Sequence, residues 1–163
     1  MTHATHGVAN VRWLRQAKTE LSGLLTDCIG DGYVKNAAEL EKFKKFVNDD
    51  SVLKRLQEIK RIKKQQFADY AFKKEGVTID PDSIFDVQAK RMHEYKRQLL
   101  NAMNVISLYA ELLDDPNKDI HPQTFIFGAK AASGYLRAKQ FIKLICYLAE
   151  DIKKHPKINE KLN

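Results

Sequence analysis

The order of predicted elements after Gly76 constrains the fold of this chain more than any other feature. Ile84–Ala89 is short and bounded by turn residues, which is typical of a strand, and the continuous apolar run Thr124–Phe127 predicts a second, buried strand. Helical spacing of apolar residues predicts helices from about Glu94 to Leu113 and over Tyr135–Ile152. Strand, helix, strand, helix is a βαβα unit, in which neighbouring strands run parallel through a right-handed crossover.

Apolar spacing also predicts which side of each helix faces the core. In the first helix the residues expected to point inward are Leu99, Met103, Ile106, Ala110 and Leu113. In the second helix they are Ala138, Phe141, Ile145, Leu148 and Ile152.

Parallel strands need helices on both faces of their sheet, and two strands with two helices cannot supply that cover. We therefore expect an α/β chain in which residues 77–163 form a βαβα portion of a larger, doubly wound, Rossmann-like sheet. On its own that portion is predicted to be incomplete.

Residues 1–76 are predicted to be a mainly helical lead-in. Thr19 and Asn36 are suitable residues to cap two helices, and Asp49–Ser51 opens a longer one. Gly30 and Gly76 are expected to end the first and the last of these helices, because glycine tolerates a positive φ.

Composition narrows the class of protein. The chain has 163 residues, 28 Lys and Arg against 21 Asp and Glu, and a net charge of +7. Its apolar runs fall short of the roughly 18–20 residues that span a bilayer, and its first residues lack the pattern of a secretory signal. Cys28 and Cys146 match no metal or redox spacing, so we expect free thiols, no metal site and a reducing, cytoplasmic location. The short apolar runs lead us to expect no membrane partner.

Much of the positive charge lies in one part of the chain. Residues 35–75 hold twelve basic and seven acidic residues, and Lys54–Lys64 is the densest run. This run could bind a polyanion, but Leu56, Ile59 and Ile62 within it have the spacing of an inward face. We therefore favour a solvated helix face over a nucleic-acid site.

A second concentration of charge follows the first predicted strand. Lys90–Arg97 contains four basic residues in eight, and the small-residue loop Gly128–Gly134 follows the second strand. Ligands of open α/β sheets bind outside the carboxyl ends of the strands, where helix N-termini also favour anions. The sequence therefore predicts an anion site here, with ordinary solvated surface as the alternative. His93 by itself is interpreted as structural, and the loop matches neither a dinucleotide fingerprint nor a Walker motif.

Ser83–Asn101 closely resembles the signature of the α-glucan (glycogen, starch and maltodextrin) phosphorylases. Gly7-Val8 with Arg12-Trp13-Leu14, and Ile29–Val34, resemble further motifs of that family in the same order. Phe127–Tyr135 resembles its Gly-Gly-Lys-Ala-Ala-Pro-Gly-Tyr segment. The resemblance covers nearly the whole chain.

The resemblance implies a hexosyltransferase that cleaves α-1,4-glucans with inorganic phosphate and releases glucose 1-phosphate. It also implies that pyridoxal phosphate is the cofactor and acts through its phosphate group. The chain would be the opening part of a glycosyltransferase-B-like domain, and the intact enzyme would be a homodimer. By motif position, Arg91 and Lys96 resemble residues that hold the substrate phosphate. Lys96, Lys90 and Tyr95 resemble residues near the cofactor phosphate, and His6 stands where the family has an asparagine that contacts the sugar.

The chain departs from the family pattern at several positions. Asn10-Val11 stands where Pro-Arg is usual, Ala129 replaces a glycine, and Ser133 replaces a proline. In the family, the lysine that forms a Schiff base with the cofactor belongs to a motif downstream of the Gly-Tyr loop, and that motif is absent from this sequence. We therefore expect the chain alone to be inactive and to need the rest of the polypeptide as its partner. The competing interpretations are a non-catalytic basic protein that binds nucleic acid or another polyanion, and a nucleotide-sugar glucan synthase.

Overall fold

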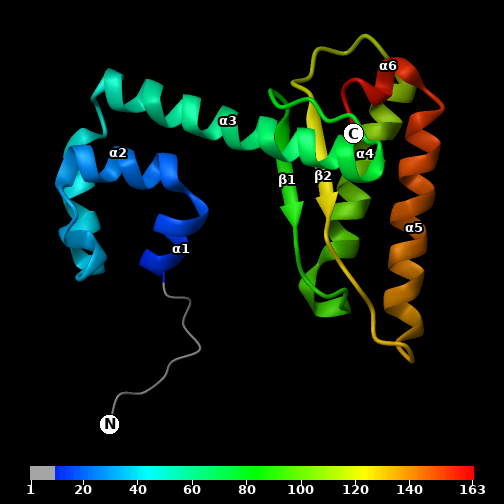
Figure 1. Ribbon diagram of the computed structural model, residues 1–163. Coiled ribbons are helices and arrows are strands. Elements are labelled where there is room, and N and C mark those ends of the chain that lie inside the picture. Colours follow the sequence, from blue (N-terminus) through cyan, green and yellow to red (C-terminus); the bar gives the residue numbers. More distant parts are fainter. Residues whose placement is uncertain (1–9) are drawn as a thin grey trace. The chain divides into compact units, whose positions relative to one another are not determined.

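The computed structural model describes the backbone of residues 10–163 (Figure 1). Its helices and strands are α1 (Asn10–Ala17), α2 (Thr19–Ile29), α3 (Asp50–Glu75), β1 (Ile84–Gln88), α4 (Gln98–Asp114), β2 (Gln123–Phe127), α5 (Leu136–Lys153) and α6 (Pro156–Asn159). Three 3₁₀ segments accompany them, namely η1 (Gly32–Val34), η2 (Ala37–Phe46) and η3 (Glu94–Lys96). None of the helices in this described part is long and apolar enough to cross a membrane.

The chain divides into two compact units, Met1–Phe67 and Ala68–Asn163, so that α3 contributes residues to both. Local capping explains the helices of the first unit. Gly30 ends α2 with a φ of +75°, and the Asn36 side chain accepts a hydrogen bond from the Ala38 amide at the start of η2. Asp49 Oδ1 accepts bonds from the amides of Ser51 and Val52 at the start of α3. The boundaries at Gly30, Asn36 and Asp49 agree with the sequence predictions. The prediction that Thr19 caps α2 is wrong, because Lys18 occupies the N-cap position and no side chain caps the helix there.

The basic run on α3 is largely a solvated face. Arg55 forms an ion pair with Asp27 at 2.7 Å, and Lys63 forms one with Glu20, also at 2.7 Å. Leu56 and Ile59 are half-buried, as their spacing predicts, but Ile62 is 45% exposed and the expectation that it points inward is wrong. The apolar stripe of α3 is therefore shorter than its sequence pattern.

The second unit contains a two-stranded parallel sheet, so the prediction of an α/β fold with parallel neighbouring strands is confirmed. β1 and β2 lie side by side and point the same way (Figure 1), in a register that runs from Ile84 opposite Gln123 to Gln88 opposite Phe127. Within this unit, α4 packs against α5 and α6. The main apolar cluster consists of Val105, Tyr109, Leu112, Ile152, Ile158 and Leu162.

Helix α4 corrects two sequence expectations. It begins at Gln98 and not at about Glu94, because Arg97 adopts a left-handed φ of +62° between η3 and α4. The face expected to be inward is wrong as well, since Met103, Ile106, Ala110 and Leu113 are exposed. The buried residues are Gln98, Ala102, Val105, Tyr109 and Leu112. Because α4 carries apolar residues on more than one side, contact with α5 and not periodicity decides which side is buried.

Helix α5 agrees with its predicted face. Ala138, Phe141 and Ile152 are buried, while Ile145 and Leu148 are half-buried. Cys28 and Cys146 are free thiols, as predicted.

Candidate anion-binding site

The anion site predicted at the strand ends corresponds to a shallow, open depression. Lys90 and Arg91 lie in the segment after β1, separated from its last residue by Ala89, and Lys130 lies in the loop after β2. The depression is lined by Ala89, Lys90, Arg91, Gly128, Ala129 and Lys130. Parallel pairing brings the carboxyl ends of both strands to one edge of the sheet, so residues distant in sequence meet here.

Backbone hydrogen bonds hold the two loops together beside the depression. The Gly128 amide donates to the Gln88 carbonyl at 3.1 Å, and the Met92 amide donates to the Lys130 carbonyl at 3.1 Å. The Met92 side chain is only 2% exposed and belongs to a small apolar cluster with Ala138 and Phe141. Burial of Met92 anchors the turn between Arg91 and His93, both of which are exposed.

Gln98 fixes the same turn from the start of α4. Its side chain is buried, with 1% of the residue exposed, and its Nε2 donates to the carbonyls of Lys90 at 3.1 Å and Arg91 at 3.2 Å. Its Oε1 accepts a hydrogen bond from the His93 amide at 3.1 Å. All three bonds go to the segment that carries the basic residues, so Gln98 is a positioning residue for the depression.

Lys96 lies against the same segment. Its Nζ donates to the Arg91 carbonyl at 3.1 Å and sits 5.7 Å from the centre of the Tyr95 ring. Tyr95 is 72% exposed, and its ring lies 4.4 Å from that of His93. Lys96 and Tyr95 therefore adjoin the turn that bears Arg91, although neither lines the depression itself.

The acidic residue of this segment has its own partners. Tyr135 donates a hydrogen bond from its hydroxyl to Glu94 Oε2 at 2.7 Å, and Arg137 lies 3.4 Å from Glu94 Oε1. The bond to Glu94 raises the pKa of the Tyr135 hydroxyl. Engagement of Glu94 with Tyr135 and Arg137 ties the turn after β1 to the start of α5.

The cations of the depression lack such partners. Among the described residues, Lys90, Arg91 and Lys130 take part in no ion pair with a carboxylate. Three neighbouring positive side chains repel one another, and an anion placed between them would offset that repulsion. Arginine offers a planar fork for two oxygens and each lysine offers a point charge. The arrangement is thus suited to phosphate.

A family model described as carbohydrate phosphorylase matches residues 1–163. This chain belongs to the carbohydrate phosphorylase family. The family resemblance seen in Ser83–Asn101 and its flanking motifs is confirmed.

Relatives named as glycogen phosphorylases support the assignment to this phosphorylase family. A protein of Bacillus subtilis is 44% identical over 156 residues, which cover 96% of this chain and 20% of the relative. One from Synechocystis is 42% identical over 161 residues, covering 99% and 19% of the two chains. The liver form from Homo sapiens is 42% identical over 158 residues, covering 97% and 19%. The chain spans about a fifth of the length of these curated relatives.

The phosphorylase chain thus brings together most of the residues that the sequence singled out. Lys90 and Arg91 line the depression, Lys96 and Tyr95 adjoin it, and His6 lies outside the described residues. Sequence reasoning did not select Lys130 or Gln98 as site residues. Lys130 could have been found from its place in the loop after the second strand, but no periodicity or charge pattern marks Gln98.

Proposed function

We propose that this chain is a segment of an α-1,4-glucan phosphorylase, the enzyme that releases glucose 1-phosphate from glucan chains with inorganic phosphate. The observation that carries the proposal is the depression at the ends of two parallel strands, lined by Lys90, Arg91 and Lys130 without carboxylate partners among the described residues. Relatives at 42–44% identity that are named glycogen phosphorylases support the choice of substrate.

In this proposal the basic residues have separate roles. Arg91 holds the substrate phosphate through its guanidinium fork, and Lys96 contributes a second positive charge from beside the Arg91 carbonyl. Two phosphate dianions repel strongly at close range, and concentrated positive charge lowers the cost of bringing them together. Gln98 keeps the segment in place, and His6 is the proposed contact to the sugar.

The residues present also fit the phosphate group of pyridoxal phosphate. Lys90 and Lys96 are basic, and Tyr95 is exposed beside Lys96. No carboxylate among the described residues neutralises either lysine by an ion pair. These three residues would hold the cofactor phosphate. When bound, the cofactor would supply the chemistry of its phosphate group and not that of its aldehyde.

The finer points of architecture belong to the same proposal. The parallel pair β1–β2 with α4 and α5 is what a portion of a doubly wound, Rossmann-like sheet would contain. Residues 1–76 would form the helical lead-in and residues 77–163 the opening of that domain. The intact enzyme would be a cytoplasmic homodimer.

Phosphate binding by the chain tests the proposed site. Inorganic phosphate and glucose 1-phosphate would be titrated into the chain and followed by amide chemical shifts. We expect the shifts to concentrate on residues 89–96 and 128–130, and to weaken strongly in Arg91→Ala. Lys60→Ala is the matched control, because Lys60 is an exposed cation on the basic face of α3.

Two results would contradict the proposed site. One is an Arg91→Ala variant that binds phosphate as the parent does. The other is a loss of phosphate binding that is larger in Lys60→Ala than in Arg91→Ala. Salt-sensitive binding of duplex DNA that depends on Lys60 would instead favour a polyanion-binding protein.

A further inference from the structure

One carboxylate stands inside the basic segment that follows β1. Glu94 is the single acidic residue of Lys90–Arg97, and the loop Gly128–Gly134 contains none. Glu94 stands three residues after Arg91 and two before Lys96, which is within range of these long side chains. An unrestrained carboxylate there would pair with the cations that a phosphate needs, because charge-assisted hydrogen bonds to arginine and lysine are favourable for either anion.

The structure directs that carboxylate toward α5 instead. Glu94 Oε2 accepts a hydrogen bond from the Tyr135 hydroxyl at 2.7 Å, and Glu94 Oε1 lies 3.4 Å from Arg137 Nε. The Tyr135 hydroxyl in turn accepts a bond from the Glu94 amide at 3.3 Å. Tyr135 and Arg137 stand at the N-terminal end of α5, where the helix dipole also favours a negative charge. Both carboxylate oxygens therefore have partners outside the basic segment.

Packing holds the Tyr135 ring in place for this bond. The His93 ring contacts two tyrosines, with its centre 4.4 Å from that of Tyr95 and 5.1 Å from that of Tyr135. Met92 is buried in a cluster with Phe141 of α5, and Tyr135 packs against the same cluster. Because these contacts do not involve the hydroxyl, its removal should release the carboxylate and leave the ring where it is.

The cations of the site are left without a carboxylate partner. Among the residues that the structure describes, none of the four lysines and arginines at or beside the depression forms an ion pair with a carboxylate, namely Lys90, Arg91, Lys96 and Lys130. Cations in two adjoining loops attract any nearby negative charge. Glu94 would supply that charge if its partners on α5 did not hold it.

We propose that Tyr135 and Arg137 hold Glu94 away from the phosphate-binding cations and so keep Arg91 and Lys96 available to phosphate. Tyr135 and Arg137 are positioning residues, because they act through Glu94 and not by contact with the anion. The inference rests on the proposed function, since it concerns the phosphate affinity of the same depression. Loss of the Tyr135 bond turns Glu94 into an internal competitor of phosphate.

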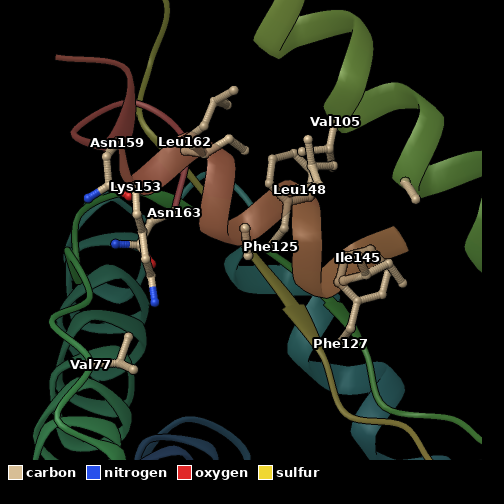
Figure 2. A pocket seen from close by; sticks show the side chains of 13 residues that line it. Val77, Val105, Phe125, Phe127, Ile145, Leu148, Lys153, Asn159, Leu162 and Asn163 are labelled. Atoms are coloured by element: carbon tan, nitrogen blue, oxygen red, sulfur yellow. The ribbon is translucent and has the colours of Figure 1, made fainter. Parts of the chain in front are cut away.

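The apolar cavity beside β2 does not compete for phosphate. It has a volume of about 210 Å³, with Phe125 and Phe127 on one side and Ile145 and Leu148 of α5 across from them (Figure 2). Lys153 has the only charged side chain among the described residues that line it. Moving a phosphate from water into such a cavity is costly unless several cations pair with it. Chemical shifts of Ile145 and Leu148 therefore give a phosphate titration an internal reference.

Phosphate titration of four chains tests the proposal. They are the parent, Tyr135→Phe, Glu94→Gln and the double variant. Phenylalanine keeps the ring and removes the hydroxyl, while glutamine keeps an oxygen that can accept from Tyr135 and removes the charge. We expect Tyr135→Phe to weaken phosphate binding about three- to fivefold, which is the range of an exposed charge pair. Glu94→Gln should bind within about twofold of the parent, because a paired and exposed carboxylate is largely screened. The double variant should bind as Glu94→Gln does.

Rescue by Glu94→Gln separates this role from a purely structural one. If Tyr135 only braced the turn, its loss would weaken binding equally with and without the charge of Glu94. Glu150→Gln removes the same charge from an exposed position on α5 and should not rescue Tyr135→Phe. Tyr147→Phe is the matched control for loss of a hydroxyl, since Tyr147 is 58% exposed on α5, and it should leave phosphate binding unchanged.

Arg137→Gln tests the same role with the tyrosine intact. It removes the other partner of Glu94, so it should also weaken phosphate binding, and Glu94→Gln should rescue it. This variant decides the question if Tyr135→Phe lowers the midpoint of thermal unfolding.

Three results would overturn this inference alone. One is a Tyr135→Phe chain that binds phosphate as the parent does, and another is a loss that persists undiminished in the double variant. The third is a Glu94→Gln chain that binds phosphate about tenfold more tightly than the parent, because Glu94 would then already be competing. Absence of phosphate binding in both the parent and Glu94→Gln would overturn this inference together with the proposed site.

Discussion

Replacing Gln98 with methionine should loosen the turn that carries Lys90 and Arg91. Methionine keeps the volume and helix preference of glutamine, so the substitution isolates the loss of the amide. That amide makes three hydrogen bonds, to the carbonyls of Lys90 and Arg91 and from the amide of His93.

The expected magnitude follows from those three bonds. A net contribution of about 1 kcal/mol for each bond gives a loss of about 2–3 kcal/mol in the free energy of unfolding. The Arg91 carbonyl keeps its bond from Lys96 and the turn is near water, which places the value toward the lower end. Phosphate affinity should fall as well, because the cations are no longer held together.

Urea unfolding and phosphate titration on the same samples measure both effects. Gln140→Met is the matched control, since Gln140 is exposed on α5 and its replacement should change stability by less than about 0.5 kcal/mol. Gln98→Glu should recover only part of the stability, because a carboxylate can accept from the His93 amide but cannot donate to the two carbonyls. Full stability and unchanged phosphate affinity in Gln98→Met would refute the positioning role.

Three further predictions concern catalysis and pH. In a full-length phosphorylase carrying this segment, Arg91→Ala should cost about 2.7–4 kcal/mol of transition-state stabilisation, which is about a hundred- to a thousandfold in phosphate-dependent turnover. Arg91→Lys should recover part of this loss, and Lys60→Ala should change turnover little. Steady-state kinetics at varied phosphate concentration would measure all three effects. The isolated chain, given glycogen, phosphate and pyridoxal phosphate, should release no glucose 1-phosphate, and turnover that Arg91→Ala abolishes would contradict this. The hydrogen bond from Lys63 lowers the pKa of Glu20 from 4.5 to about 2. A carboxyl group with a depressed pKa stabilises the fold above its unfolded pKa, so this contribution should be lost as the pH falls from about 4.5 toward 2. Urea midpoints measured across that range should lose this part of their pH dependence in Glu20→Gln, and an unchanged profile would disprove the coupling.

Much of the fold could be predicted because its signals are local. Gly30 and Gly76 have positive φ values, and Asn36 caps with its own side chain, so each boundary depends on a few adjacent residues. The charged turn after β1 was equally visible, because four basic residues stand where a strand passes into a helix. The family resemblance predicts roles for Arg91 and Lys96 that charge alone does not distinguish, and those roles stay predictions.

Other features depend on contacts between segments that are distant in the chain. The heptad-like stripe of Met103, Ile106 and Leu113 is as apolar as the side of α4 that is buried, and only packing against α5 selects between them. Gln98 is recognisable as a positioning residue only once α4 lies under the turn of Lys90 and Arg91.

The sequence by itself determined the order of strands and helices, the parallel direction of the strands and the basic segment that follows the first of them. These depend on backbone preferences, side-chain periodicity and chirality, which act over short stretches of chain. Only the tertiary structure decided which side of α4 is buried, how Lys130 joins Lys90 and Arg91, and that Leu162 forms a parallel bridge with Gln123 of β2. Each of those outcomes depends on contact between segments that are far apart in the sequence. The free energy of burial then selects one surface among several that are almost equally apolar in sequence.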